Sequence, residues 1–286
     1  MNQAQNPTLK NKTVIITAGN QGGGAVIALR FAASGANVAV IAEKNPLSEK
    51  ISTDPILEKI ITAGGKAIAL EVNLSDVNDI QLAVQKTIAH FGGIDIVINN
   101  YSIFNFKNSI HTTSDEFHSL MKNIYATFFI SQSCIDALKK SENPHVINIA
   151  PPLDMSSAIE ACQNHLLFSI SKYAMSFCTL GMAKEFEPYG IAFNSLWQDR
   201  PIATQTLIRN FSDQVVKGSN KPEIYAEATY QIALKPAKTF TGNFCIDETV
   251  LREVSIDPSQ YAVDSTATPV KDIFLSGVDY DILNLR

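Results

Sequence analysis

Short apolar runs alternate with longer amphipathic stretches along most of this chain, and no other feature of the sequence restricts its possible folds so strongly. The apolar runs have the length and nearly continuous hydrophobicity of strands covered on both faces. They are TVIIT (13–17), NVAVIA (37–42), KAIALEV (66–72), IDIVIN (94–99), HVINIA (145–150), IAFNSLW (191–197) and NFCID (243–247). Helical patterns lie between them at 22–34, 55–63, 76–91, about 115–139, 165–187 and 222–234. This alternation predicts an α/β fold with a doubly wound parallel sheet of about seven strands, right-handed crossovers and helices on both faces.

The alternation stops after residue 251. We expect residues 1–251 to form a single domain, because no internal repeat, low-complexity tract or linker interrupts them. Residues 252–286 are expected to form a tail packed on that domain or on a partner subunit. The apolar residues that suggest such packing are Tyr261, Val263, Ile273, Phe274, Leu275, Tyr280, Ile282 and Leu283.

The charge balance argues against two classes of partner. The 23 basic and 28 acidic residues give a net charge of −5, and the mean hydropathy of +0.04 is that of an ordinary globular protein with a sizeable core. The longest basic run is Lys139-Lys140, so we expect no binding to nucleic acid or to a membrane. The longest apolar runs fall far short of the ~20 residues that a membrane span needs. The N-terminus, MNQAQNPTLKNK, has no apolar stretch of signal-peptide length. We therefore expect a cytoplasmic protein that binds a small molecule.

The four cysteines are Cys134, Cys162, Cys178 and Cys245. They lie far apart, with no C-x-x-C pair and no neighbouring pair of histidines. We predict buried thiols in a reducing compartment, with no disulfide framework and no metal site.

The first apolar run leads directly into TAGNQGGG (17–24), and a helical pattern follows. Glycines at such a turn let backbone N–H groups approach a pyrophosphate at the start of a helix. A glycine-rich turn between a strand and a helix can also be purely structural. Its place in the first strand–helix unit of a doubly wound sheet favours a dinucleotide site.

From this loop onward the chain resembles the short-chain dehydrogenase/reductase family, whose loop reads T-G-x-x-x-G-x-G. The resemblance spans roughly residues 10–275 and implies a Rossmann-type domain that binds NAD or NADP. The chain is most similar to the hydroxysteroid dehydrogenase-like 2 branch, and we expect it without the sterol-carrier domain that can follow there. The matching stretches are INN (98–100), VINIA (146–150), INIAPPLDM (147–155), FSISK (168–172), KYAMSFCTLGMAKEF (172–186), NSLW (194–197), FTGNFCIDETVL (240–251) and YAVDSTATPV (261–270).

The reaction of that family uses a tyrosine as proton donor, a lysine that lowers its pKa, a serine on the reacting oxygen and an asparagine that holds a water. By this resemblance Lys172 matches the lysine and Asn123 the asparagine, whereas Phe168 and Ala150 occupy the positions of the tyrosine and the serine. A placed acid–base group contributes ~10²–10⁴-fold, and one oxyanion donor contributes about 3 kcal/mol. We therefore expect conventional carbonyl reduction to be impaired or lost.

Some neighbouring side chains are alternative proton donors. Tyr173 is one step farther along the helix, which turns it about 100° away. Asp154, Ser156 and Ser157 follow the fifth strand and could turn inward. His165 is expected on a similar helix face to the phenylalanine. For all of these, packing or an ordinary surface role is the preferred interpretation.

The cofactor positions also depart from the family pattern. Ala18 replaces the first glycine of the loop, and Gln21 stands where relatives that use NADP often have a basic residue. The second strand ends in Ala42 and Glu43, and Glu43 would repel a 2′-phosphate by about 1–4 kcal/mol at ~4 Å. NAD is therefore slightly favoured over NADP. The expected cofactor contacts are Thr17, Ala18, Gln21, Gly22, Gly23, Gly24, Glu43, Asn73, Asn99, Lys172 and Ile202.

Two further cofactor positions also depart from the family pattern. Asn73 stands where relatives have an aspartate that meets the adenine. Tyr101 replaces a small residue that lets the backbone approach the adenosine ribose, so its ring either fills that space or turns to solvent or to the core.

Three functions remain open at this point. The favoured one is a binding or interaction protein on a dehydrogenase scaffold, which is a pseudoenzyme. The second is an NAD(P)-dependent oxidoreductase that acts on a small lipophilic alcohol or carbonyl with a non-standard proton donor. The third is different chemistry in the same pocket, such as elimination or isomerisation. Because relatives pair through the two long helices, here 115–139 and 165–187, we expect a homodimer or homotetramer.

Overall fold

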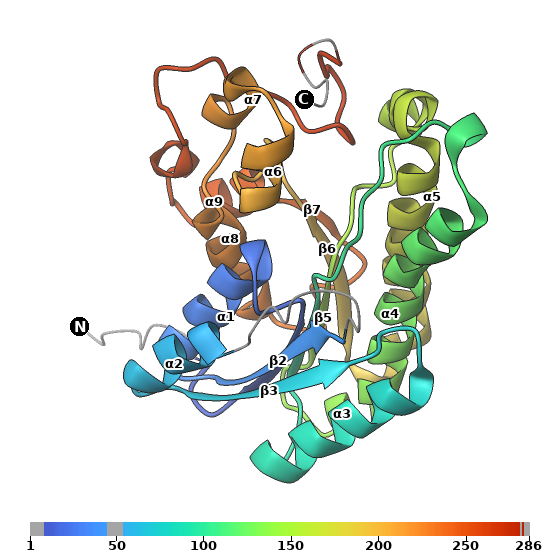
Figure 1. Ribbon diagram of the computed structural model, residues 1–286. Helices are drawn as coiled ribbons and strands as arrows, with labels where there is room; N and C mark the ends of the chain where they lie inside the picture. The colour runs from blue at the N-terminus through green and yellow to red at the C-terminus, as the bar shows by residue number, and fades with distance from the viewer. Residues whose placement is uncertain (1–8, 45–53, 281, 283–286) are drawn as a thin grey trace.

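The computed structural model describes residues 9–44, 54–280 and 282. A seven-stranded parallel sheet forms its centre, with the strand order β3-β2-β1-β4-β5-β6-β7. This confirms the predicted doubly wound sheet with helices on both faces (Figure 1). The strands are β1 (Thr13–Thr17), β2 (Asn37–Glu43), β3 (Lys66–Val72), β4 (Ile96–Asn99), β5 (His145–Ile149), β6 (Ala192–Trp197) and β7 (Phe244–Ile246).

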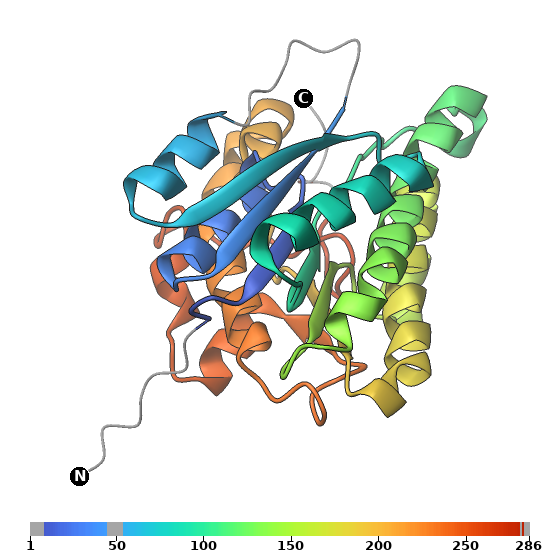
Figure 2. The same ribbon diagram turned by 90° about the horizontal axis from the view of Figure 1, so that it is seen from below.

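Helices cover the sheet in two layers, which Figures 1 and 2 show from two directions. One layer contains α1, α2 and α8, and the other contains α3, α4 and α5. The helices are α1 (Gly22–Ala33), α2 (Asp54–Thr62), α3 (Val77–Phe91), α4 (Ser114–Leu138), α5 (Met155–Glu185), α6 (Gln205–Asn210), α7 (Asp213–Lys217), α8 (Glu223–Ala233) and α9 (Asp247–Glu253). Single 3-10 turns lie at Ser109–His111, Glu187–Tyr189 and Pro258–Tyr261.

The central strands are buried on both faces because alternate side chains point to opposite helix layers. In β1, Ile16 belongs to the core beneath α1 and α8, whereas Ile15 belongs to the core beneath α3 and α4. Every residue of β1, β5 and β6 is buried. β2 pairs with one edge of β1 and β4 with the other, so the direction in which strands are added to the sheet reverses at β1. At such a reversal a crevice opens at the carboxyl ends of the strands.

Helix α5 differs from its sequence prediction. It begins at Met155 rather than at 165, and Asp154 caps it by accepting a hydrogen bond from the Ser156 backbone N–H. His165 interrupts it with φ −143° and ψ 55°, so two helices meet at a kink. The sequence pattern had identified only the part beyond the kink. Although α5 is long and apolar enough to cross a membrane, 56% of its most apolar window is buried inside the domain.

The tail beyond α9 returns to the body of the domain. After the turn at Pro258–Tyr261 it runs without regular structure past α7 towards α5, as the red trace in Figure 1 shows. Val263 and Val270 donate backbone hydrogen bonds to Ser219 and Gly218, on the segment after α7. The tail thereby reaches the carboxyl ends of the central strands.

Candidate functional site

The glycine loop after β1 has a tightly constrained backbone. Ala18, at a glycine position of the family, is left-handed with φ 50°, and Gly22 has φ 51°. A Cβ at Gly24 would lie 2.2 Å from the backbone oxygen of Ala18, whereas one at Gly23 would meet only ordinary contacts. Gln21 is the N-cap of α1 and makes no side-chain capping bond, so it leaves the first-turn N–H groups open to an anion.

Asn100 fixes this loop to β4, a role that sequence reasoning missed. Its Nδ2 donates to the backbone oxygens of Thr17 and Ala18 at 3.1 and 3.4 Å, and its own backbone N–H donates to Oγ1 of Thr17 at 2.9 Å. The motif INN (98–100) contained this signal, but only its first asparagine had been assigned to the cofactor. Asn99 instead points into the domain, where its Nδ2 donates to Ser131 and Asn148.

A second group of residues at predicted cofactor positions lies around the end of β2. Glu43 accepts a hydrogen bond from the Leu74 backbone N–H at 3.1 Å and lies 3.8 Å from Nζ of Lys122. Burial raises the pKa of Glu43, and these two partners oppose that shift. Asn73 caps its own turn by accepting from the Ser75 backbone N–H. Tyr101 is turned to the core, where burial raises its pKa and its side chain is 8% exposed.

The segment after β6 lies over the glycine loop. Thr204 caps α6, and a Cβ at Gly22 would lie 3.6 Å from Cγ2 of Thr204. Ile202 is buried and pairs with Asn220 through a single bridge. The structure therefore brings the predicted loop residues and the predicted Ile202 segment to the same end of the sheet.

Lys172 projects from α5 beneath the ends of β5 and β6. Its Nζ donates a hydrogen bond of 2.5 Å to the Ile149 backbone oxygen and lies 4.9 Å from the centroid of the Trp197 ring. The residue is 1% exposed. Burial lowers the pKa of Lys172 to about 7, and the charge of Asp272 opposes that shift. The buried amine therefore changes its protonation state near neutral pH.

Phe168 lies one helical turn before Lys172 in a cluster of aromatic rings. Its ring centroid is 6.0 Å from Phe104, 5.5 Å from Phe106 and 5.7 Å from Phe274. Its side chain is 5% exposed, and Ala150 is fully buried. Neither residue offers a hydroxyl, so the two positions contribute only packing.

Asn123 organises the chain next to this cluster. Its side-chain amide accepts from the Ile103 backbone N–H at 2.7 Å and donates to the Ile103 carbonyl at 2.8 Å. It also donates to Oγ of Ser171, whose hydroxyl donates to the Phe168 carbonyl. Asn123 thus holds the 103–107 segment, which carries Phe104 and Phe106.

The alternative proton donors have other roles. Asp154 and Ser156 form the exposed cap of α5, and Ser157 donates to the Asp154 carbonyl. The Tyr173 ring packs edge-on against Phe274, and burial raises its pKa. The kink at His165 breaks the helical spacing on which its expected position was based. The His165 ring nevertheless reaches Phe106, at a centroid distance of 4.4 Å.

The tail adds residues to the site that sequence reasoning did not assign. Asp272 accepts from Trp197 and Gln198 at the end of β6, and Phe274 is fully buried. Gln198 also accepts a hydrogen bond from the hydroxyl of Tyr225. The sequence signal for this segment was the apolar run 273–275. It predicted that the tail packs against another surface, but it did not identify the residues that the tail contacts.

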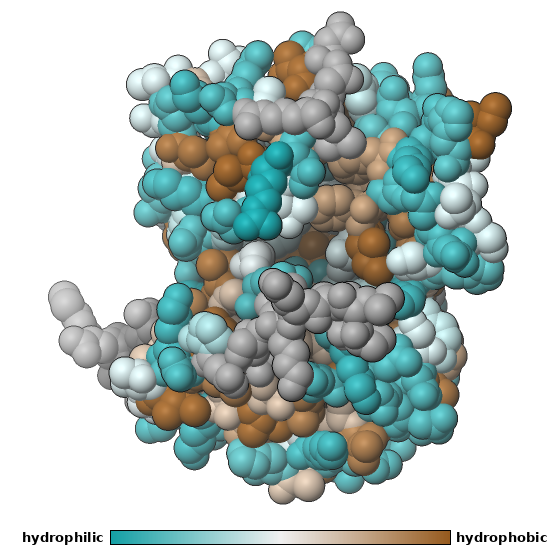
Figure 3. Space-filling view, viewed as in Figure 1, coloured by the Kyte–Doolittle hydropathy of each residue, from teal (hydrophilic) through white to brown (hydrophobic). Residues whose placement is uncertain are grey.

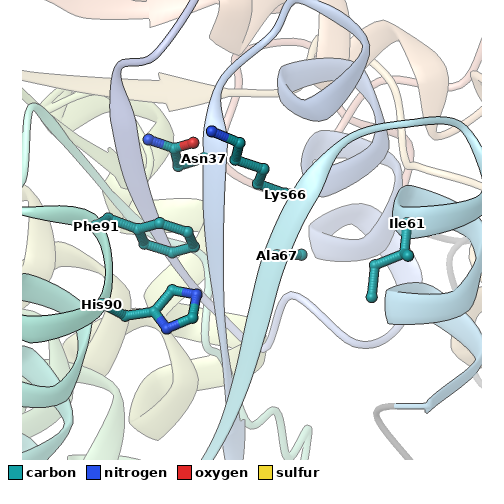
Figure 4. Close-up of a pocket in the computed structure, with 6 residues that line it drawn as sticks. All are labelled: Asn37, Ile61, Lys66, Ala67, His90 and Phe91. Carbon is teal, nitrogen blue, oxygen red and sulfur yellow. The ribbon is translucent and has the colours of Figure 1, made fainter.

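Two hollows lie near the surface. A groove of about 540 Å³ opens beside the aromatic cluster, between the 103–107 segment, α4 and α6, and its lining includes Ile103, Phe104, Phe106, Leu120 and Thr206. Figure 3 shows this face of the molecule hollowed between the α6–α7 region and the body below it. A second hollow of about 320 Å³ lies at the amino ends of β2 and β3, away from the site (Figure 4). Within the described residues, no group of three His, Cys, Asp or Glu side chains could hold a metal.

Comparisons with known proteins agree with this geometry. Residues 12–213 match the short chain dehydrogenase family. Proteins named hydroxysteroid dehydrogenase-like protein 2 from Danio rerio and Homo sapiens are both 37% identical, over 95% and 92% of the chain. The chain spans between half and two thirds of the length of such curated relatives. A putative dehydrogenase from Xanthomonas campestris has a TM-score of 0.86 and 34% identity, with 95% of this chain and 99% of that chain covered.

Proposed function

The chain belongs to the short-chain dehydrogenase family, and we propose that it is a dinucleotide-binding member in which conventional proton transfer is impaired or lost. In this proposal it acts as a binding or interaction protein. The observation that carries the proposal is the environment of Phe168 beside Lys172. A ring enclosed by Phe104, Phe106 and Phe274 occupies the donor position, and Ala150 adds no second hydroxyl.

The loop after β1 supports dinucleotide binding. Gly24 permits the close approach of α1 to the strand, and Asn100 holds the loop in place. A short chain dehydrogenase from Burkholderia cenocepacia with the same fold was solved in complex with NADP. For this chain we slightly favour NAD, because the Glu43 carboxylate would repel a 2′-phosphate and Lys122 offsets only part of that charge.

Apolar surfaces support the remaining parts of the proposal. The groove beside Phe104 and Phe106 suits a small lipophilic ligand. We propose pairing with a second copy through the outer faces of α4 and α5, as a homodimer or homotetramer. The exposed apolar residues there are Phe117, Phe128, Ile159, Leu166, Ile170, Phe177 and Leu180. The four free cysteines fit a reducing compartment and support a cytoplasmic location.

A second candidate function is oxidoreduction of a small lipophilic alcohol or carbonyl with a non-standard donor. Lys172 favours it, because a buried amine with its pKa near 7 exchanges a proton at neutral pH. Its Nζ would then act directly on the reacting oxygen, without the intervening tyrosine.

A titration of the melting temperature with NAD, NADH, NADP and NADPH tests the binding part of the proposal. A ligand at 100 times its Kd adds ~2.7 kcal/mol of stability. We expect a shift with NAD or NADH and a smaller one with the 2′-phosphorylated forms. Glu43→Gln should reduce that difference. The absence of a shift with all four dinucleotides would contradict dinucleotide binding, provided that it holds both in the native protein and in Lys271→Glu, which breaks the ion pair between the tail and Asp199.

A further inference from the structure

The C-terminal tail places a carboxylate inside the candidate site. Oδ1 of Asp272 accepts from the Trp197 indole N–H at 2.6 Å, and Oδ2 accepts from Nε2 of Gln198 at 2.7 Å. Oδ1 also accepts from the Phe274 backbone N–H at 3.1 Å. Asp272 is 4% exposed, so these three donors replace the water that a carboxylate normally binds.

Phe274 fills the apolar space next to this carboxylate. Its ring centroid is 5.7 Å from Phe168, 5.4 Å from Tyr173 and 5.3 Å from Trp197. Its side chain has no exposure at all. Phe274 therefore completes, with Phe104 and Phe106, the group of rings packed against Phe168.

Asp272 and the end of β6 surround Lys172, and Phe274 packs on the Trp197 ring beside it. Trp197 lies under the amine and is held by Asp272, and the carboxylate charge attracts the ammonium. With Lys172 only 1% exposed, a ligand hydroxyl cannot reach Nζ while this arrangement persists. A ribose could contact the amine only after some of these groups had moved.

The segment that carries Asp272 and Phe274 is attached to the domain mainly through its side chains and by few backbone bonds. Residues 270–275 have no regular secondary structure, and two backbone hydrogen bonds tie them to the body, from Val270 to Gly218 and from Asp272 to Asp199. The half-exposed Lys271 adds an ion pair of 2.6 Å with Asp199. The segment can therefore open without breaking the sheet, although opening exposes Val270, Ile273 and Phe274, which are buried in this state.

We propose that residues 270–275 are an autoinhibitory strap, which occupies the candidate site and masks Lys172 until it is released. The strap presents a carboxylate to the end of β6 and an aromatic ring to Phe168. It excludes the nicotinamide end of a dinucleotide from Lys172, and in naming that ligand it rests on the proposed function. The masking of Lys172 is independent of that function.

Two variants that loosen the strap and one control variant test the proposal. Lys271→Glu places like charges beside Asp199 and loosens the strap without altering a buried side chain. Asp272→Asn with Phe274→Ala removes its two buried contacts. Asp264→Asn is the matched control, because this exposed carboxylate in the same tail caps only its own turn at Thr266. Circular dichroism and cooperative melting establish that each variant folds, and Lys271→Glu remains informative if the double variant does not.

The first two readouts need no ligand. Trp197 is the sole tryptophan, so acrylamide quenching of its emission reports whether the strap is in place. Reductive methylation at pH 8, followed by mass spectrometry, reports access to Lys172, with the exposed Lys184 as internal reference. We expect both loosened variants to methylate Lys172 at least tenfold faster than the native protein and the Asp264→Asn control. Native-level methylation in a folded double variant, or in folded Lys271→Glu if the double variant does not fold, would overturn the proposal.

The third readout uses NADH, followed by energy transfer from Trp197 to the reduced nicotinamide. An autoinhibitory strap predicts a Kd at least tenfold lower in the loosened variants. An equal Kd in native and loosened proteins, despite an accessible Lys172, would overturn autoinhibition. If no variant binds NADH while Lys172 becomes accessible, the proposed function and autoinhibition fail, and only the masking of Lys172 stands.

Discussion

Trp197 and Asp272 are joined by a hydrogen bond of 2.6 Å from the indole Nε1 to Oδ1, which connects the end of β6 to the C-terminal tail. Lys172 lies on the face of the same indole ring, 4.9 Å from its centroid. Lys172 therefore has an indole and a tail carboxylate around it, and one helical turn away Phe168 stands where the resemblance to the family implies a tyrosine. The following predictions test how the loop, the lysine and that phenylalanine behave.

Ala18→Gly should stabilise the protein. Ala18 has φ 50°, a left-handed conformation that costs an alanine about 1–2 kcal/mol and costs glycine almost nothing. We expect the free energy of unfolding to rise by up to about 1 kcal/mol, since glycine also gives the unfolded chain more entropy. Ala25→Gly in the adjacent helix α1 is the control and should lose about 1 kcal/mol. Urea unfolding measures the stability of both variants. A loss of stability in Ala18→Gly would contradict backbone strain at Ala18.

Gly24→Ala should destabilise the protein by about 1–3 kcal/mol through overpacking. The new Cβ would lie 2.2 Å from the Ala18 carbonyl oxygen and 2.6 Å from Nδ2 of Asn100. The backbone atom cannot move without displacing the loop, so dinucleotide affinity should also fall. Gly23→Ala is the matched control, with its nearest contact at 3.7 Å, and should melt near the native temperature. Equal melting temperatures for the two variants would contradict the close approach at Gly24.

Lys172 should make stability depend on pH in the alkaline range. Its pKa is lowered by burial from 10.5 in the unfolded chain to about 7, so between these values the unfolded state binds a proton that the native state lacks. Stability therefore rises with pH in this window, by at most about 1.4 kcal/mol per pH unit. In Lys172→Met this contribution disappears. The native-minus-variant difference in the free energy of unfolding should thus shift in favour of the native protein from pH 7.5 to 9.5, and a constant difference would contradict the buried amine.

The sheet was predictable because strand and helix periods differ and because buried parallel strands are apolar throughout, as in TVIIT. The glycine loop was predictable because close backbone approach requires glycine at Gly24. Other features depend on distant contacts. Asp272 becomes a site residue only because the tail folds back over β6. The kink at His165 and the inward turn of Asn99 are set by tertiary packing and hydrogen bonds, which local patterns do not specify.

The proposed loss of the proton donor beside Lys172 is tested most directly by turnover. NADH and NADPH oxidation would be followed with a panel of small lipophilic ketones and aldehydes, in the native protein and in Phe168→Tyr combined with Ala150→Ser. Lys172→Met, made in the native and in the double-variant background, controls for the lysine. The loosened-strap variant Lys271→Glu is included in each background to remove masking. We predict no detectable turnover by the native protein with or without the strap. In the double variant we predict turnover ~10²-fold or more above the detection limit, and it should depend on Lys172. Turnover by the native protein that Lys172→Met abolishes would contradict the proposed loss of conventional chemistry.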